Sequence, residues 1–127
     1  MLYNNVTEKV IILNLKEINN KIIKFVEERE WDQFHNPKDL AISLSIESNE
    51  LLELFQWKSE HDITELLNTE FKRKVQEEIA DIAIYLILIS NKIGVNLEEA
   101  VLDKLVLNDK KYPVLKSKGN ATKCTDF

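Results

Sequence analysis

Four carboxylates occur as two pairs with the same spacing. The first pair is Glu47 and Glu50, and the second pair is Glu78 and Asp81. Residues three apart lie on one face of a helix, so each pair can present two oxygen ligands in one direction. If the two helices lie side by side and antiparallel, the four groups converge, and their mutual repulsion favours a bound cation. We therefore take this quartet as the candidate metal-binding and catalytic centre.

The surroundings of Asp81 strengthen this interpretation. Asp81 is followed by the apolar run 82–89, which contains no other charge. A carboxylate beside so much apolar surface is costly to bury unless a partner compensates it, and a solvated position for it is hard to arrange. A single Glu-x-x-Glu pair is ordinarily a solvated helix face, so the hypothesis depends mainly on Asp81 and on the repeated spacing.

The ligand types indicate which cation the quartet would hold. Neither His35 nor His61 follows a glutamate by three residues, as the histidines of di-iron bundles do. Without imidazole or thiolate ligands, zinc and iron are disfavoured. Oxygen-only ligation suits Mg²⁺, with Mn²⁺ second, and Mg²⁺ commonly binds a few carboxylates together with substrate phosphates. The pattern therefore predicts a nucleotide or another phosphorylated ligand.

Ring-bearing and basic side chains could hold such a ligand. Trp31, Phe34 and His35 fall within five positions, and Trp57 follows the first carboxylate pair. These rings could form a box for a base, although aromatic residues near helix ends are equally often part of a core. Three lysines could reach phosphate oxygens as point charges, although surface lysines are usually only solvated. They are Lys104, Lys110 and Lys111.

Four helices are expected to position these groups. Hydrophobic residues recur at spacings of three and four over about 7–30, 37–58 and 69–92, and again after Asn96. The residue before Pro37 disfavours helix, and Gly94 is placed to end the third helix. We expect the second half of that helix to be a central element, buried on most sides. The segment 59–68 reads as a polar loop and 114–127 as a polar tail, so the predicted fold is all-α, a four-helix bundle-like single domain over residues 1–127.

The composition disfavours several classes of protein. The chain has 127 residues, of which 44% are hydrophobic and 31% charged, as expected for one globular domain. A net charge of −5 is unfavourable for binding nucleic acid or an anionic membrane, and no apolar run approaches the roughly 18 residues of a membrane span. The single cysteine, Cys124, and the lack of a basic leader are typical of a reduced cytoplasmic protein.

The quartet and its surroundings resemble a known family. Glu-x-x-Glu, then residues 51–77, then Glu-x-x-Asp is similar to the signature of the all-α nucleoside triphosphate pyrophosphatases, the MazG-like superfamily. Several flanking segments resemble its dCTP pyrophosphatase branch, and the likeness spans about 25–126. These segments are 25–35, 53–58, 76–86 and 108–113.

The resemblance implies a reaction and a set of site residues. The reaction is hydrolysis of a (deoxy)nucleoside triphosphate, such as dCTP or a modified dCTP, to the monophosphate and pyrophosphate, which would clean the nucleotide pool. Bound Mg²⁺ would neutralise the triphosphate and acidify a water, and Glu50 or Glu78 could accept the proton. The resemblance also implies a dimer or a tetramer whose sites neighbouring subunits complete. It places Mg²⁺ on the four carboxylates, nucleoside contacts at 31–35, Trp57 and Tyr85, and phosphate contacts at Asn108 and Tyr112.

Two positions depart from the pattern of these relatives. Ile22 stands where relatives can carry a histidine, nine positions before Trp31, and Asn49 stands where they favour glycine. Because Ile22 leaves the preferred base open, dUTP or an oxidised nucleotide stays as an alternative substrate. A helical interaction module without catalysis is the alternative from another class, and a ferritin-like metal carrier would lack its histidines.

Overall fold

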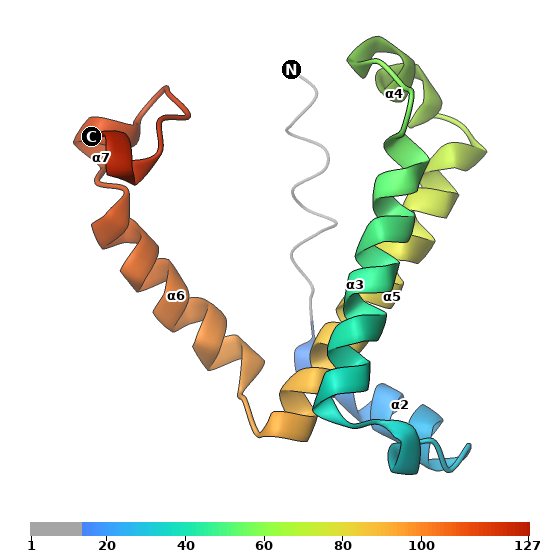
Figure 1. Ribbon diagram of the computed structural model, residues 1–127. Helices are drawn as coiled ribbons and strands as arrows, with labels where there is room; N and C mark the ends of the chain where they lie inside the picture. Colours follow the sequence, from blue (N-terminus) through green and yellow to red (C-terminus); the bar gives the residue numbers. More distant parts are fainter. Residues whose placement is uncertain (1–13) are drawn as a thin grey trace.

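The computed structural model describes residues 14–127, and that range contains helices but no strand (Figure 1). This confirms the all-α prediction. The predicted start of the first helix, near Thr7, lies outside the described residues. The helices are α2 (Leu15–Glu27), α3 (Pro37–Phe55), α4 (Glu60–Leu66), α5 (Glu70–Ile93), α6 (Leu97–Lys111) and α7 (Val114–Ser117), with short 3-10 turns η1 (Asp32–Phe34) and η2 (Cys124–Asp126).

The centre of the fold is an antiparallel hairpin of the two longest helices, α3 and α5 (Figure 1). The Asn36 side chain accepts a hydrogen bond from the Asp39 N–H at 2.9 Å and caps α3, whose first turn holds Pro37. Gly94 ends α5 in the left-handed conformation, with φ of 72°. Helix α2 packs at the base of the hairpin. The buried apolar side chains of these helices are Ile22, Val26, Leu40, Phe71, Val75 and Ile87.

The segment 59–68 is not the loop that its polar composition predicted. It contains α4, which a capping box begins: Ser59 Oγ accepts from the Asp62 N–H at 3.2 Å, and Asp62 Oδ2 accepts from the Ser59 N–H at 2.9 Å. Two of the otherwise unpaired donors at the helix start are satisfied in this way. The capping residues therefore outweigh the lack of a strong apolar stripe.

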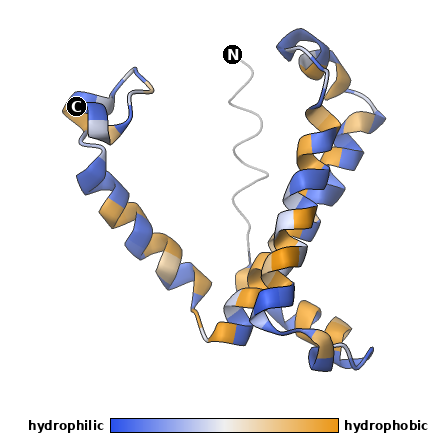
Figure 2. Cartoon of the chain, viewed as in Figure 1, coloured by the Kyte–Doolittle hydropathy of each residue, from blue (hydrophilic) through white to orange (hydrophobic). Residues whose placement is uncertain are grey.

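The second half of α5 is less buried than its apolar sequence predicted. Ile87 and Ser90 are buried there, but Ile84 and Leu86 are 37% and 39% exposed, and Ile79 earlier in the helix is 53% exposed. Helix α3 covers one face of α5 and α2 covers part of another, so the remaining apolar sides face outward (Figure 2). The prediction of burial on most sides is therefore wrong for the packing of residues 14–127 in one copy of the chain.

Helix α6 leaves the hairpin and forms a separate arm (Figures 1 and 2). The tail folds back at the far end of this arm, where the rings of Tyr112 and Phe127 meet edge to face with centroids 6.1 Å apart. No helix in the range 14–127 is both long and apolar enough to cross a membrane. The apolar side chains of α6 that stay more than half exposed are Val101, Leu102, Leu105, Val106 and Leu107.

Candidate metal centre

The hairpin brings three of the four predicted carboxylates together. One oxygen atom from each of Glu47, Glu50 and Glu78 lies within 4.8 Å of the other two. Helix α3 supplies the first two side chains and α5 supplies the third, so the antiparallel packing of two helices creates the cluster. Glu47 and Glu78 are half-buried and Glu50 is exposed. A single cation could therefore contact oxygens from both helices.

Asp81 lies beside this cluster rather than within it. It follows Glu78 by almost one turn of α5, and its charge helps to raise the pKa of both Glu47 and Glu78. Its side chain is exposed, so the expectation that Asp81 lacks a solvated position is wrong. The apolar residues that follow it are distributed around the helix, and several of them are exposed in turn. Asp81 can still contribute a fourth oxygen donor on the open side.

The electrostatics of the cluster favour a divalent cation. Partial burial raises the pKa of Glu47, and repulsion from Glu50, Asp81 and Glu78 adds to this. The pKa of Glu78 is raised by desolvation first, and then by the charges of Glu50 and Asp81. A bound cation would relieve these repulsions. The all-oxygen donor set fits a hard cation such as Mg²⁺ and contains no sulfur or imidazole ligand.

The first group of predicted base contacts lies at the α2–α3 junction, residues 31–35, which we call the corner. The Trp31 N–H donates to the Val26 carbonyl at 3.1 Å, and its ring meets Phe25 edge to face at 5.8 Å. Trp31 and Phe34 are 44% and 65% exposed. His35 is half-buried, and its Nδ1 is enclosed without a hydrogen-bond partner among the described residues. The corner therefore presents open rings at the base of the hairpin.

The predicted box of aromatic rings does not form within one chain. Trp57 follows the C-terminal end of α3, whereas the corner precedes its N-terminal end. The 19 residues of α3 span about 28 Å at 1.5 Å per residue, which is too far for the two groups to share one base. Trp57 has a left-handed backbone, with φ of 63°, and its side chain is 93% exposed. Tyr85 lies on α5 one turn after Asp81, half-buried.

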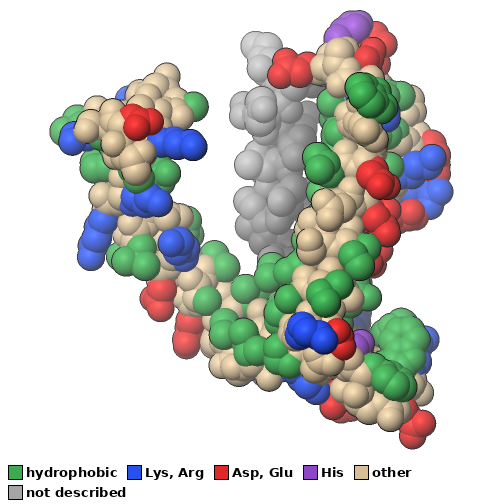
Figure 3. Space-filling view, in the orientation of Figure 1, with side chains coloured by type: hydrophobic (Ala, Val, Ile, Leu, Met, Phe, Trp, Pro, Cys, Tyr) green, Lys and Arg blue, Asp and Glu red, His purple; other side chains and the backbone are tan. Residues whose placement is uncertain are grey.

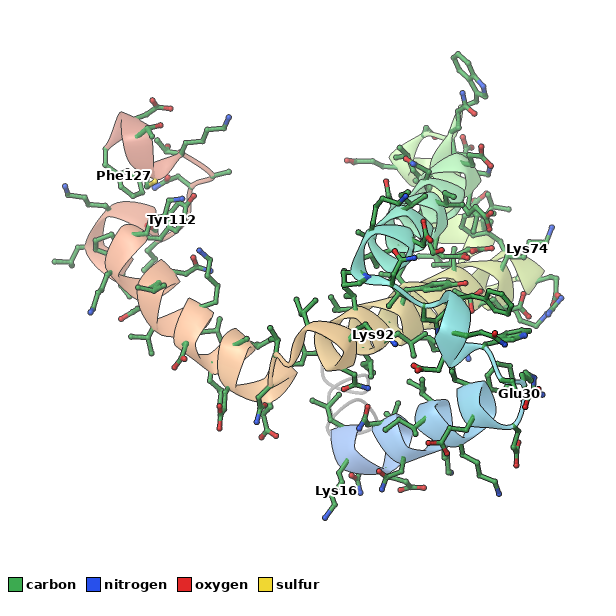
Figure 4. The ribbon with its side chains drawn as sticks, turned by 60° about the horizontal axis from the view of Figure 1, so that its bottom comes forward. Lys16, Glu30, Lys74, Lys92, Tyr112 and Phe127 are labelled. Carbon is green, nitrogen blue, oxygen red and sulfur yellow. The ribbon has the colours of Figure 1, made fainter. Side chains whose placement is uncertain are left out.

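The predicted phosphate contacts are also remote from the carboxylates within one chain. They lie on α6 and at its end, on the arm that leaves the hairpin (Figure 4). Figure 3 shows acidic side chains at the start of this arm and basic ones further along it, and it shows side chains of both signs on the hairpin. Lys111 Nζ lies 5.7 Å from the centre of the Tyr112 ring. The residues concerned are Lys104, Asn108, Lys110, Lys111 and Tyr112.

One contact near the site was not predicted. Lys92, in the last turn of α5, donates to Asp32 Oδ1 in the corner at 2.9 Å, across 60 positions of sequence. Lys92 follows Glu78 by 14 residues, close to four helical turns. This spacing places a lysine on the carboxylate face of a long helix, but it does not indicate that Asp32 is its partner.

Comparisons with known proteins find a matching family and several relatives of this chain. Residues 42–127 match the model of the MazG-like family. The chain is 40% identical over 114 residues to "dCTP pyrophosphatase 1" of Bos taurus, covering 89% of this chain and 68% of that protein. The human protein of the same name is 34% identical over 114 residues, covering 89% and 67%. A crystal structure of a pyrophosphatase from Archaeoglobus fulgidus is similar at a TM-score of 0.74 and 41% identity, covering 80% of this chain and 94% of that one.

Proposed function

The chain belongs to the MazG-like family, and we propose that it is an enzyme that hydrolyses a nucleoside triphosphate to the monophosphate and pyrophosphate. The convergence of Glu47, Glu50 and Glu78 is the observation that carries this proposal. The proposed substrate is dCTP or a modified dCTP, because relatives named dCTP pyrophosphatase 1 are 34–40% identical over most of the chain. Removal of such nucleotides from the pool is the corresponding role.

The proposed chemistry divides among the residues of the hairpin. Glu47, Glu50 and Glu78 would hold Mg²⁺, with Mn²⁺ as a possible substitute, and Asp81 would complete the donors. When bound, the cation would neutralise part of the phosphate charge and lower the pKa of the attacking water. The water oxygen would bond to the α or the β phosphorus, the bond from that phosphorus to the oxygen that bridges the two would break, and the monophosphate and pyrophosphate would separate. Glu50 or Glu78 accepts the proton that the water loses.

We further propose that the chain works as a homodimer or homotetramer. The exposed apolar face of α6 and the exposed apolar sides of α5 form a large surface that a second copy could cover. The distance between Trp57 and the corner supports the same proposal, because rings from different copies could enclose one base. A second copy could likewise bring Lys104, Asn108 and Lys111 to the triphosphate.

The proposal includes neither nucleic acid nor a membrane as a partner. A net charge of −5 gives little attraction to a polyanion, and the phosphate of a single nucleotide is accommodated through the metal instead. A reducing compartment such as the cytoplasm suits a chain with one cysteine.

Pyrophosphate release from a panel of nucleotides tests the function. The panel contains dCTP, 5-methyl-dCTP, dUTP and 8-oxo-dGTP, each with and without Mg²⁺. We expect Mg²⁺-dependent release that is fastest with dCTP or its modified form. A preference for dUTP or the oxidised nucleotide would correct the substrate alone. No release from any nucleotide, together with no stabilisation by Mg²⁺ in calorimetry, would favour a non-catalytic helical module.

A further inference from the structure

Among the described residues, a single lysine makes the hydrogen bonds that tie the corner to α5. Lys92 Nζ donates to the Asp32 side chain at 2.9 Å and approaches the Asp32 backbone carbonyl at 3.4 Å. The same carbonyl accepts a hydrogen bond from the His35 N–H at 3.1 Å, which closes the η1 turn. Lys92 therefore contacts both the side chain and the turn that orients His35.

The other contacts of the corner connect it to its neighbours in sequence. Trp31 bonds to Val26 and packs on Phe25, and Gln33 Nε2 donates to the Glu30 carbonyl at 2.8 Å. These contacts join the corner to the end of α2, and Asn36 joins it to the start of α3. In the part of the chain that the structure describes, Lys92 supplies the hydrogen bonds between the corner and α5.

Helix α5 connects the Lys92–Asp32 contact, which we call the tie, to the metal centre. It runs without a break from Glu70 to Ile93 and carries Glu78, Asp81 and Lys92. Lys92 lies 11 residues after Asp81 and 14 after Glu78, about 16 and 21 Å along the axis and close to whole numbers of turns. The carboxylates and the lysine therefore share one face of a rigid helix. The tie consequently sets where the corner lies relative to the carboxylates.

A cavity of about 310 Å³ lies where the tie joins the corner to the helices. Its apolar wall includes Val26, Leu40 and Leu88, and its polar wall includes Asp32, His35 and Lys92. Because His35 Nδ1 has no hydrogen-bond partner among residues 14–127, no described bond from that atom fixes the ring. The orientation of His35 therefore depends on the turn that Lys92 holds.

We propose that Lys92 is a positioning residue. Through Asp32 it holds the corner at a fixed position relative to the carboxylates, and it thereby sets the affinity for the nucleotide. This inference rests on the proposed function, because it takes the corner as the base-binding element. Lys92 itself contacts no reacting atom and binds no metal. Loss of the Lys92 side-chain charge should raise the KM for the nucleotide. It should leave kcat nearly unchanged and the Mg²⁺ dependence of the rate unchanged.

The expected size of the effect follows from the exposure of the pair. The side chain of Lys92 is 32% exposed and that of Asp32 is 74% exposed, so water screens their attraction. Exposed pairs of this kind contribute little, and the corresponding rise in KM is about two- to fivefold. The helices keep their caps and buried contacts, so the protein should remain folded.

The first experiment compares Lys92→Met with Lys92→Arg in steady-state kinetics with dCTP and Mg²⁺. Methionine keeps much of the apolar stem without the charge and should raise KM, whereas arginine should restore the affinity. Lys21→Met is the matched control, because Lys21 pairs with Glu17 at 2.9 Å within α2, away from the corner. An unchanged KM in Lys92→Met, or a loss confined to kcat, would overturn the inference.

The second experiment measures the corner without relying on activity. The chain has two tryptophans, so Trp57→Phe leaves Trp31 as the only one. In that background, Lys92→Met should increase acrylamide quenching of Trp31, and the exchanged pair Asp32→Lys with Lys92→Asp should reduce it again. Unchanged quenching would show that the tie does not hold the corner. If the wild-type chain hydrolyses no nucleotide, the proposed function fails, and this measurement still decides whether the tie positions the corner.

Discussion

The α3–α5 hairpin and the α6 arm are built from equally regular helices, yet they differ in how far one chain covers them. Leu40 in the hairpin is 2% exposed, whereas Leu102 and Leu105 on the arm are each 57% exposed. Both regions are well capped: the Asn96 side chain accepts from the Glu99 N–H at 3.1 Å, much as Asn36 does for α3. Local capping therefore begins both helices in the same way, but among residues 14–127 only the hairpin finds a packing partner.

The same division separates the chemical groups. The carboxylates that could hold a metal lie on the hairpin, whereas the lysines proposed to meet phosphate lie on the arm. If the two regions have these different roles, a change in the hairpin should abolish the reaction in every copy. A change in the arm should act through the contact between copies. The following predictions test that distinction.

The largest effect is expected from the hairpin carboxylates. Glu78→Gln removes a charged oxygen ligand from the cluster, and we expect pyrophosphate release to fall at least about a hundredfold, as for other groups that stabilise developing charge. Glu77→Gln is the control, because the neighbouring Glu77 pairs with Arg73 on another face of α5. Circular dichroism should show the same helix content for both. Comparable losses in the two variants would contradict the assignment of Glu78.

The convergence of Glu47, Glu50 and Glu78 could be predicted from the sequence because its determinants are largely local. The spacing of Glu47 and Glu50 on one helix needs only helical periodicity, and a single antiparallel contact then brings Glu78 to them. The exposure of Asp81 depends instead on which faces the tertiary structure covers. The roughly 28 Å length of α3, which separates Trp57 from the corner, follows from where that helix begins and ends. The Ser59 and Asp62 spacing of the capping box is present in the sequence. The polar composition of the segment nevertheless favoured a loop, so the helix was not predicted. The contact between Lys92 and Asp32 joins positions 60 residues apart, so no local pattern could specify it.

The next effect is expected from the apolar face of the arm. Leu105→Glu places a charge where a second copy is proposed to pack, so the assembly should dissociate and activity should fall about tenfold or more. Light scattering coupled to size exclusion would show the mass fall towards that of one chain. Asp103→Asn, on the same helix, should change neither quantity. A wild-type chain that is already monomeric and active would remove the basis for the proposed assembly.

A mixing experiment asks whether one site uses both regions from different copies. Glu78→Gln is defective in the hairpin, and a double variant, Lys104→Ala with Lys111→Ala, is defective in the arm. In a random mixture, half of the dimers contain one chain of each kind, and one of their two sites is then intact. Activity should return to about a quarter of the wild-type value. If the mixture shows only the residual activity of its components, the arm does not complete the site of a neighbouring copy.

The smallest effect concerns stability, and its sign follows from the raised pKa values of Glu47 and Glu78. Both lie above the usual 4.5 in the folded chain. Between the usual and the raised pKa, the folded state binds more protons than the unfolded state, so the metal-free protein loses stability as pH rises through that window. Mg²⁺ binding requires the deprotonated carboxylates, so its stabilisation should be larger at pH 7.5 than at pH 5.

Scanning calorimetry with and without Mg²⁺ at the two pH values measures how much the cation raises Tm at each pH. We expect the rise at pH 7.5 to exceed the rise at pH 5 by roughly a few degrees. Glu47→Gln should reduce both the loss of metal-free stability with rising pH and the stabilisation by Mg²⁺. Glu77→Gln should retain them, because Glu77 is paired with Arg73. Equal stabilisation by Mg²⁺ at both pH values would mean that the cation binds elsewhere. The contrast between hairpin and arm would then describe packing alone, because the hairpin would no longer be the metal-binding region.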